Sequence, residues 1–237
     1  MGTKMKIATV IYLGVPVLVV QVLGALVLAT PAAADSPVAV VEEIKGKVTG
    51  AEFMDYVTPR SVIKIADGGS VIISYLNSCR RETITGAGTV VIGTEQSIVD
   101  QAVLKAEKTN CDSNQANATS KDTSGVAATL LRSYDSAKAP ALPQPQLTLY
   151  GASPFIEAKG RGTLLVRRLD VTGERHEIAL GGTQLKGKFV DFAREDVALI
   201  PGGLYAASFK SSEIVFRVDE KAKPGATPVV GRLLRLE

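Results

Sequence analysis

The chain is divided into short runs rich in Val, Ile and Thr, and these runs are bounded by Gly, Asp or Asn. Such runs are typical of β-strands, because β-branched side chains fit a pleated sheet and the bounding residues accept the backbone angles of tight turns. The pattern covers residues 38–112, stops, and resumes over residues 147–237. The sequence therefore predicts an all-β protein with two β-domains.

Residues 38–112 are expected to form a small β barrel or sandwich. Two glycine-rich turns, Asp67-Gly68-Gly69-Ser70 and Gly86-Ala87-Gly88, predict β-hairpins. Residues 97–105 are expected to form one continuous strand. The turn chemistry thus predicts that neighbouring runs pair with one another.

The only two cysteines, Cys79 and Cys111, both lie in this first domain. An isolated pair in an oxidising compartment is most often a structural disulfide, and its spacing does not match a zinc or thioredoxin motif. Closing a loop of about 33 residues stabilises a domain by roughly 3–4 kcal/mol in the chain-entropy model. We expect the two to be joined, with two buried free thiols as the alternative.

Residues 113–146 change to Ser, Thr, Asn, Lys and Ala and end in a stretch with alternating prolines. Prolines at that spacing favour an extended and fairly stiff spacer. The segment is therefore predicted to be a linker between the two β-domains. Residues 147–237 are predicted to form a β-sandwich, because short strands recur there with turn residues between them. Residues 197–200 and 229–236 are among its expected strands.

The start of the chain has the order of an export signal. A short segment with two lysines precedes residues 7–29, which are almost entirely apolar, and small residues follow at Ala32 and Ala34. Residues 1–34 are thus predicted to be a signal peptide cleaved after Ala34. The apolar run is also long enough, at about 20 residues, to cross a bilayer, so an uncleaved anchor is the alternative. Both place the remaining chain outside the cytoplasm, in the periplasm or secreted.

The near balance of basic and acidic residues excludes nucleic acid as a partner. The 27 basic residues include the two lysines of the signal segment, so the rest nearly balance the 24 acids. Nucleic-acid binding requires a concentrated basic face, and none is predicted. Arg161, Arg167, Arg168, Arg175, Lys186 and Lys188 would form a basic strip if their strands aligned, but protection of an edge strand is the preferred interpretation because acids are interspersed.

Two motifs in the first domain are similar to those of a known family. Val40-Val41-Glu42-Glu43-Ile44-Lys45-Gly46-Lys47-Val48, followed by Ile65-Ala66-Asp67-Gly68-Gly69-Ser70-Val71-Ile72-Ile73, resembles the extracytoplasmic FecR-like domain. The resemblance covers about a third of the chain after residue 34 and implies a β-domain. The best-known members look like transmembrane regulators with a cytoplasmic segment, a role not carried over here because only six residues precede the apolar run.

A motif in the second domain, residues 199–209, resembles the "L-x-P-G-x-x-Y" corner of fibronectin type III and related immunoglobulin-like modules. In those modules the tyrosine hydroxyl bonds back to the chain at a strand corner. Tyr205 is the matching residue. The resemblance implies an immunoglobulin-like β-sandwich with Tyr205 as a structural corner.

Catalytic motifs are absent from the sequence, since it contains no metalloprotease, nucleophile-elbow or phosphate-loop pattern. His176 is the only histidine, and it is interpreted as a solvated side chain. The acids at turns and strand ends, Asp55, Asp67, Asp112, Asp170 and Asp191, are interpreted as structural. The chain is predicted not to be an enzyme, with no catalytic, cofactor-binding or metal-binding residue.

Three functions follow, in order of preference. The first is a noncatalytic exported binding or scaffold protein of the cell envelope, with signalling as one form of that role and an envelope protein or glycan as partner. The second is a membrane-anchored envelope sensor component, if the apolar segment is retained. The third is an envelope hydrolase that uses carboxylates dispersed in the sequence. The sequence does not predict the oligomeric state.

Overall fold

The computed structural model describes residues 2, 36–116, 142–181 and 189–236. The expected signal segment with its cleavage site at Ala34, most of the expected linker, and Lys186 and Lys188 lie outside the described residues. Where the chain is described it is built from β-strands, which confirms the all-β prediction. Over the same residues, no helix has the length and apolar character needed to cross a membrane.

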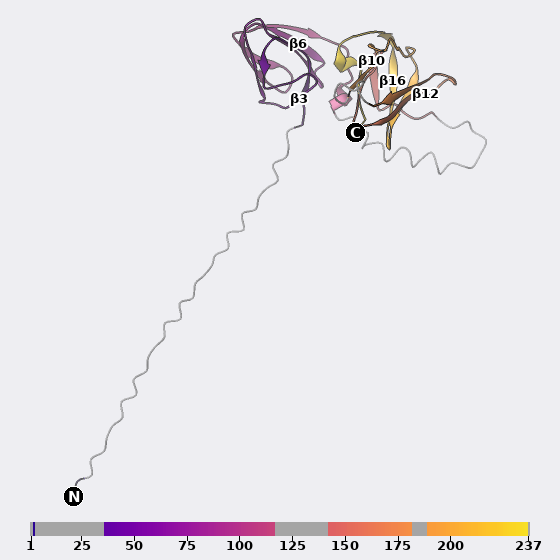
Figure 1. The fold of residues 1–237 in the computed structure, drawn as a ribbon, viewed down its shortest axis with the longest axis horizontal. Helices are drawn as coiled ribbons and strands as arrows, with labels where there is room; N and C mark the ends of the chain where they lie inside the picture. The colour runs from indigo at the N-terminus through magenta and orange to yellow at the C-terminus, as the bar shows by residue number, and fades with distance from the viewer. Residues whose placement is uncertain (1, 3–35, 117–141, 182–188, 237) are drawn as a thin grey trace. The chain divides into compact units, whose positions relative to one another are not determined.

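Residues 38–112, here called the first lobe, form two separate antiparallel sheets (Figure 1). The strand orders are β3-β1-β5-β6-β9 and β2-β4-β7-β8, so of the two architectures expected, the sandwich is the one observed. The bounds of the strands are β1 Ala39–Lys45, β2 Val48–Thr49, β3 Tyr56–Val57, β4 Val62–Ile65, β5 Ser70–Tyr75, β6 Arg80–Thr85, β7 Gly88–Ile92, β8 Ser97–Asp100 and β9 Val103–Lys108.

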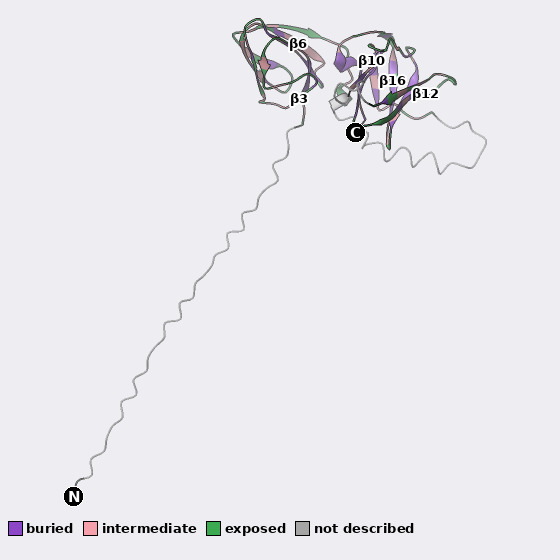
Figure 2. Ribbon diagram, viewed as in Figure 1, coloured by how far each residue is buried: buried purple, intermediate pink, exposed green. Residues whose placement is uncertain are grey.

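Alternate side chains of these strands fill the space between the two sheets. Ile63, Ile73 and Ile84 are fully buried in a core made mainly of valine and isoleucine; Figure 2 colours buried segments of the ribbon purple. Tyr75 is buried in the same core, and its hydroxyl lies 2.9 Å from the Ser97 hydroxyl. Burial raises the pKa of Tyr75 to about 12. Successive side chains of a strand point to opposite faces of the sheet, so one face of each strand supplies this core.

The two glycine-rich turns do not form hairpins. The turn at Asp67–Ser70 joins β4 to β5, and the turn at residues 86–88 joins β6 to β7, but in each case the two strands belong to different sheets. Gly68 does have the positive φ, +70°, that the turn chemistry implied. The turn residues thus set the local backbone correctly, whereas the strand that each run pairs with is decided by packing across the sandwich.

The expected continuous strand at residues 97–105 is also divided. β8 ends at Asp100 in one sheet, and β9 begins at Val103 in the other. Gln101 between them has a φ of +67°, which breaks the extended backbone. The chain crosses from sheet to sheet at this point.

The Cys79–Cys111 disulfide is present. Cys79 lies in the turn from β5 to β6, and Cys111 follows β9, so the bond ties the end of the lobe to a central hairpin. The same place is held by backbone, since the Thr109 N–H donates to the Cys79 carbonyl at 2.8 Å. The predicted pairing is therefore confirmed, and the bond closes a covalent loop that contains most of the second half of the lobe.

Residues 147–236, the second lobe, also form two sheets. The orders are β10-β16-β15-β12-β13 and β14-β11-β17, with β10 parallel to β16 and β11 parallel to β17. The bounds are β10 Leu147–Gly151, β11 Phe155–Ala158, β12 Gly162–Arg168, β13 Arg175–Leu180, β14 Phe189–Asp191, β15 Leu204–Phe209, β16 Ser212–Lys223 and β17 Leu233–Leu236. Two expected strands differ: residues 197–200 are not a strand, and residues 229–236 divide into a 3-10 turn, η4 Val229–Gly231, followed by β17.

Tyr205 is fully buried near the start of β15 and has the contact of a tyrosine corner. Its hydroxyl accepts the Ile200 N–H at 2.9 Å and donates to Glu174 Oε2 at 2.8 Å. Burial, and then the hydrogen bond to the Glu174 carboxylate, raise the pKa of Tyr205. Glu174 also faces Arg168 at 3.4 Å. An ionic network that the motif did not imply therefore completes the corner.

The two lobes share a third apolar cluster, apart from their own cores. Val40, Met54 and Leu76 of the first lobe pack with Phe155, Val230 and other residues of β11, η4 and β17. Residues 35–237 accordingly belong to one compact unit. Part of the outer face of one sheet in each lobe is thereby buried.

Candidate functional site

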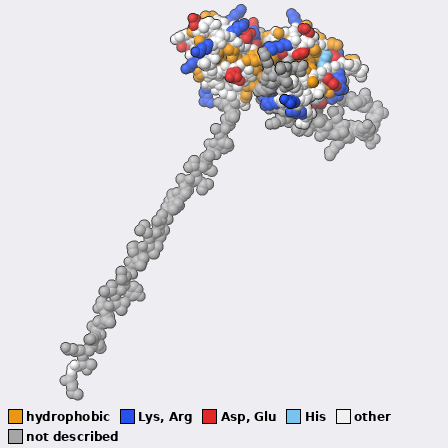
Figure 3. Space-filling view, viewed as in Figure 1, with side chains coloured by type: hydrophobic (Ala, Val, Ile, Leu, Met, Phe, Trp, Pro, Cys, Tyr) orange, Lys and Arg blue, Asp and Glu red, His pale blue; other side chains and the backbone are white. Residues whose placement is uncertain are grey.

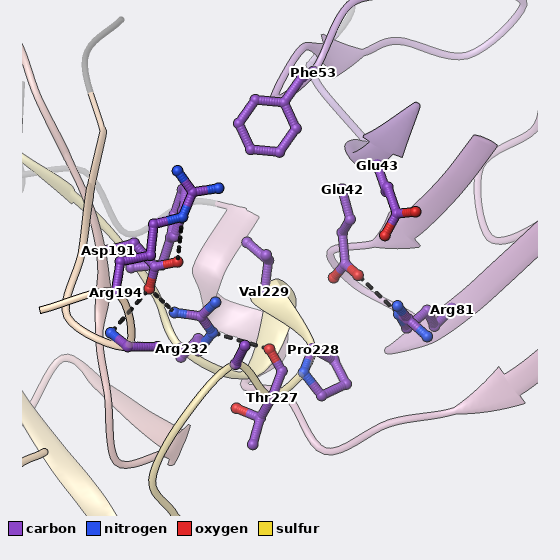
Figure 4. Close-up of a pocket in the computed structure, with 13 residues that line it drawn as sticks. Glu42, Glu43, Phe53, Arg81, Asp191, Arg194, Thr227, Pro228, Val229 and Arg232 are labelled. Atoms are coloured by element: carbon purple, nitrogen blue, oxygen red, sulfur yellow. Dashed lines mark hydrogen bonds and ion pairs between the residues drawn. The ribbon is translucent and has the colours of Figure 1, made fainter. Parts of the chain in front are cut away.

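A cleft of about 430 Å³ lies where the two lobes meet (Figure 4). Its walls come from β1 and β6 of the first lobe, and from β11, the end of β14 and the segment from Ala226 to Arg232 around η4 of the second. Thirteen residues line it: Glu42, Glu43, Phe53, Arg81, Phe155, Asp191, Ala193, Arg194, Ala226, Thr227, Pro228, Val229 and Arg232. Ligand sites in proteins commonly have this size and lie between packed units of structure.

A β-bulge in β1 positions Glu42 on the cleft wall. The pairing of β1 with β5 is regular up to Val41, opposite Ile73, and resumes at Glu43, opposite Ile72. Glu42 is the extra residue between them. A bulge changes the side to which a side chain points, so two successive glutamates come to lie away from the first lobe's core.

The Glu42 carboxylate is buried and fully engaged. It accepts hydrogen bonds from the Ser74 hydroxyl at 2.8 Å, from Arg81 Nε at 2.8 Å, and from the Val230 N–H at 3.3 Å. The last bond crosses between the lobes. Arg81 continues outward to Glu107, 2.9 Å from Nη1. Because a buried carboxylate needs partners for its lone pairs, this set explains how a charge is tolerated here.

The opposite wall is built around the Arg232 guanidinium, whose side chain is only 3% exposed. Nη1 donates to Asp191 Oδ1 at 2.6 Å and to the Ser153 carbonyl at 3.1 Å, while Nε donates to the Thr227 carbonyl at 2.9 Å. The guanidinium also lies 5.3 Å from the centre of the Phe155 ring. Arg232 is thus a fixed, satisfied charge that shapes the wall.

Phe53, Arg194 and Glu43 are among the cleft side chains that remain accessible to solvent. Phe53 is 50% exposed, and Figure 4 shows its ring above the opening, between the glutamates of the first lobe and the Asp191–Arg232 pair. Arg194 is largely exposed and faces Asp191 at 3.7 Å. Glu43 is partly exposed and pairs with Lys45 outside the cleft. These three are the groups that a ligand would meet first.

The cleft therefore combines apolar surface with charges of both signs. Phe155, Pro228 and Val229 contribute apolar lining, and each lobe contributes a carboxylate and a guanidinium group. An arrangement of this kind holds a ligand by apolar contact and orients it by a few polar groups. Within the described ranges there is no group of three or more His, Cys, Asp or Glu side chains suited to a metal ion.

The residues singled out from the sequence do not gather in one site of the structure. Of the acids interpreted as structural, Asp55 accepts the Glu52 N–H at 2.7 Å and Asp112 accepts the N–H groups of Asn114 and Thr148, whereas Asp191 ends β14 and also lines the cleft. The turn interpretation holds for the first two, but Asp191 has a second role.

His176, expected to be a solvated side chain, is only partly so, with 28% of its side chain exposed. Its ring packs edge-on against Phe192, with centroids 6.2 Å apart, and Nε2 is buried 3.6 Å from Glu174 Oε1. The reason is its place in β13 opposite Val166, a residue of the second lobe's core. His176 lies outside the cleft.

Three arginines of the expected basic strip are paired with acids. Arg167 pairs with Glu213, Arg168 with Asp170 and Glu174, and Arg175 with Glu177. Figure 3 shows acidic and basic side chains interspersed on the viewed face. This arrangement agrees with the preferred interpretation, in which charges protect the edge of a sheet.

Sequence reasoning did not identify Glu42, Arg81 or Arg232 as site residues. Two adjacent glutamates inside an otherwise apolar run, at residues 42 and 43, were the available signal, because such a pair breaks the alternation expected of a strand. No comparable signal marks Arg232, whose ion-pair partner in the cleft, Asp191, lies 41 residues away in the sequence. Comparisons of the chain with protein-family models, with curated proteins and with solved structures give no match.

Proposed function

We propose that this protein is a noncatalytic binding or scaffold protein of the cell envelope, exported to the periplasm or secreted, and that the cleft between its lobes holds its ligand. The partner class is an envelope protein or a glycan. The observation that carries this proposal is the cleft itself, with apolar lining, fixed charges from both lobes, and accessible Phe53, Arg194 and Glu43 at its opening.

The disulfide supports export. Bonds of this kind persist in oxidising compartments and are rare in the cytosol of mesophiles. The predicted signal order of the first 34 residues points the same way. We therefore place the ligand outside the cytoplasm as well.

The state of the carboxylates supports a noncatalytic role. Glu42 accepts three hydrogen bonds, and Asp191 accepts bonds from Arg232 and from the Ala193 N–H. A general acid or base must reach the atom with which it exchanges a proton, and the hydrogen bonds to protein groups already occupy oxygens of both carboxylates. These groups are better suited to shaping a site than to proton transfer.

The second lobe supports the proposed likeness to immunoglobulin-like modules, through its two-sheet sandwich and the contact from Tyr205 to Ile200. We retain the FecR-like likeness of the first lobe as a proposal on its motifs. Modules of both kinds serve as binding or spacer domains, though fold alone does not imply function.

Capture from cell-envelope extract tests the proposal. Purified protein is immobilised, and proteins and glycans retained by the wild type are compared with those retained by Phe53→Ser and Arg194→Ala. Because both side chains are exposed, neither change should impair folding. We expect each to reduce recovery of the wild-type partner by about tenfold, which corresponds to roughly 1.4 kcal/mol.

A matched control is Val171→Ser, since Val171 is 55% exposed but lies on a turn of the second lobe outside the cleft. Recovery should be unchanged for Val171→Ser and for His176→Ala. If the cleft variants recover the partner as well as the controls do, the site is wrong. If the purified protein turns over an envelope substrate, and one Asp or Glu substitution abolishes turnover at unchanged stability, the noncatalytic role is wrong.

A further inference from the structure

An apolar row crosses the outer face of the sheet β2-β4-β7-β8 in the first lobe. Val62 of β4 is opposite Val91 of β7, and Val91 is opposite Ile98 of β8. Side chains directly opposite one another on neighbouring strands lie on the same face of the sheet. These three residues, here called the apolar row, therefore form one continuous line.

The apolar row faces outward. Its strand neighbours Ile63 and Val90 are fully buried in the lobe's core, so alternation directs the row to the other face. Val62 is 44% exposed and Ile98 is 70% exposed. Exposed apolar residues scattered singly are normal, but a contiguous line of β-branched side chains across three strands is a feature of contact surfaces.

A polar row lies next to it, two residues further along the strands. Lys64 of β4 is opposite Thr89 of β7, and Thr89 is opposite Asp100 of β8. Lys64 and Asp100 are both exposed. A positive charge and a negative charge thus stand about 10 Å apart, at equal distances on either side of β7, as strand spacing requires.

We propose that this face binds a second copy of the same chain. A two-fold axis parallel to β7 exchanges the positions on either side of that strand. It sets Val62 of one copy against Ile98 of the other, places the two Val91 side chains together, and brings each Lys64 to the partner's Asp100. Each charge of the polar row therefore meets the opposite charge of the second copy across the two-fold axis. This self-complementarity is the condition for a closed, isologous dimer.

The extent of the contact implies weak association. Three apolar side chains and two flanking ion pairs on one small sheet fall at the low end of specific interfaces, below about 1,200 Å² in total. Lys and Asp on the same face keep the apolar row from promiscuous aggregation. The dimer places the cleft of each copy outside the contact, because the cleft lies on the other sheet's side of the lobe, so this proposal does not rest on the proposed function.

Sedimentation equilibrium of the purified chain, at concentrations up to about 1 mM, tests the dimer. Lys64→Asp and Asp100→Lys should each raise the dissociation constant about tenfold, because each sets like charges opposite one another in the contact. The double variant K64D/D100K restores opposite charges and should restore the wild-type constant. A wild type that stays monomeric, or a double variant no tighter than the single ones, overturns the proposal.

A second pair of variants separates the apolar row from general surface effects. Ile98→Glu should abolish the dimer, since a charge would be buried against Val62 of the partner copy. Val103→Glu is the matched control, because Val103 is 68% exposed on β9 of the other sheet. Circular dichroism confirms that both fold. Equal loss of association in the two variants, or no loss in Ile98→Glu, overturns the assignment to this face.

Discussion

The two lobes are both sandwiches, yet they are held together by different means. The first has a mostly aliphatic core and a covalent bond from Cys79 to Cys111. The second has no disulfide in its described residues. Its core includes Phe192, Phe209 and Phe216 together with Tyr205, whose hydroxyl enters an ionic network. A disulfide acts mainly by constraining the unfolded chain, whereas the network acts in the folded state. The lobes should therefore respond to different perturbations.

Removing the disulfide should have the largest effect. We expect Cys79→Ser combined with Cys111→Ser to lower the free energy of unfolding by about 3–4 kcal/mol, because the bond closes a loop with a sequence separation of 32. Urea denaturation followed by tyrosine fluorescence measures this, since the chain has no tryptophan. Reductant should reproduce the loss in the wild type and have no effect on the variant. Equal urea midpoints for the two proteins contradict the prediction.

Uncoupling the lobes should come next. Glu42→Gln removes the charge that Arg81 and the Val230 N–H contact, and should cost about 2 kcal/mol, typical of hydrogen bonds to a charged group. Faster hydrogen exchange at Val230 would place the loss at the contact between lobes. Glu43→Gln is the control, because that exposed neighbour should change stability by less than about 0.5 kcal/mol. Unchanged exchange at Val230 in Glu42→Gln would show that the bond does not couple the lobes.

Removing the corner hydroxyl should affect the second lobe alone. Tyr205→Phe deletes the acceptor for the Ile200 N–H and the donor to Glu174, and should cost about 1 kcal/mol. Hydrogen exchange should quicken at Ile200 and stay unchanged at Ile73 in the first lobe's core. A uniform change in both lobes contradicts the comparison.

Acid should weaken the second lobe through a small effect at Asp170. The hydrogen bond from Arg168 lowers the pKa of Asp170 in the folded protein. The stabilisation from this bond is therefore fully present above the pKa of the unfolded carboxyl, about 4, and is lost as the pH falls through the lower pKa of the folded state. The site is partly exposed, so the effect should stay below about 1 kcal/mol. Asp170→Asn should flatten this part of the stability curve below pH 4, about where the unfolded carboxyl titrates. An unaltered curve contradicts the assignment.

The sequence alone was enough to predict features that depend on neighbouring residues. Runs of Val, Ile and Thr predicted strands such as β5, the glycine-rich turn at Asp67–Ser70 predicted the positive φ that Gly68 adopts, and the motif at residues 199–209 predicted the hydroxyl contact of Tyr205. Each follows from backbone sterics and side-chain alternation within a few residues. The cysteine pairing followed because the chain offers a single pair.

Only the tertiary structure decided what depends on contacts between distant segments. Turn residues do not encode which sheet a strand joins, so β4 and β5 were expected to pair although packing assigns them to different sheets. Glu42 and Arg232 are separated by most of the chain, and they line one cleft because the outer faces of two sheets bury the cluster around Val40 and Phe155. Burial of apolar surface is non-directional and acts between whole faces. The spacing of residues in the sequence therefore does not predict which distant segment packs on the outer face of each sheet.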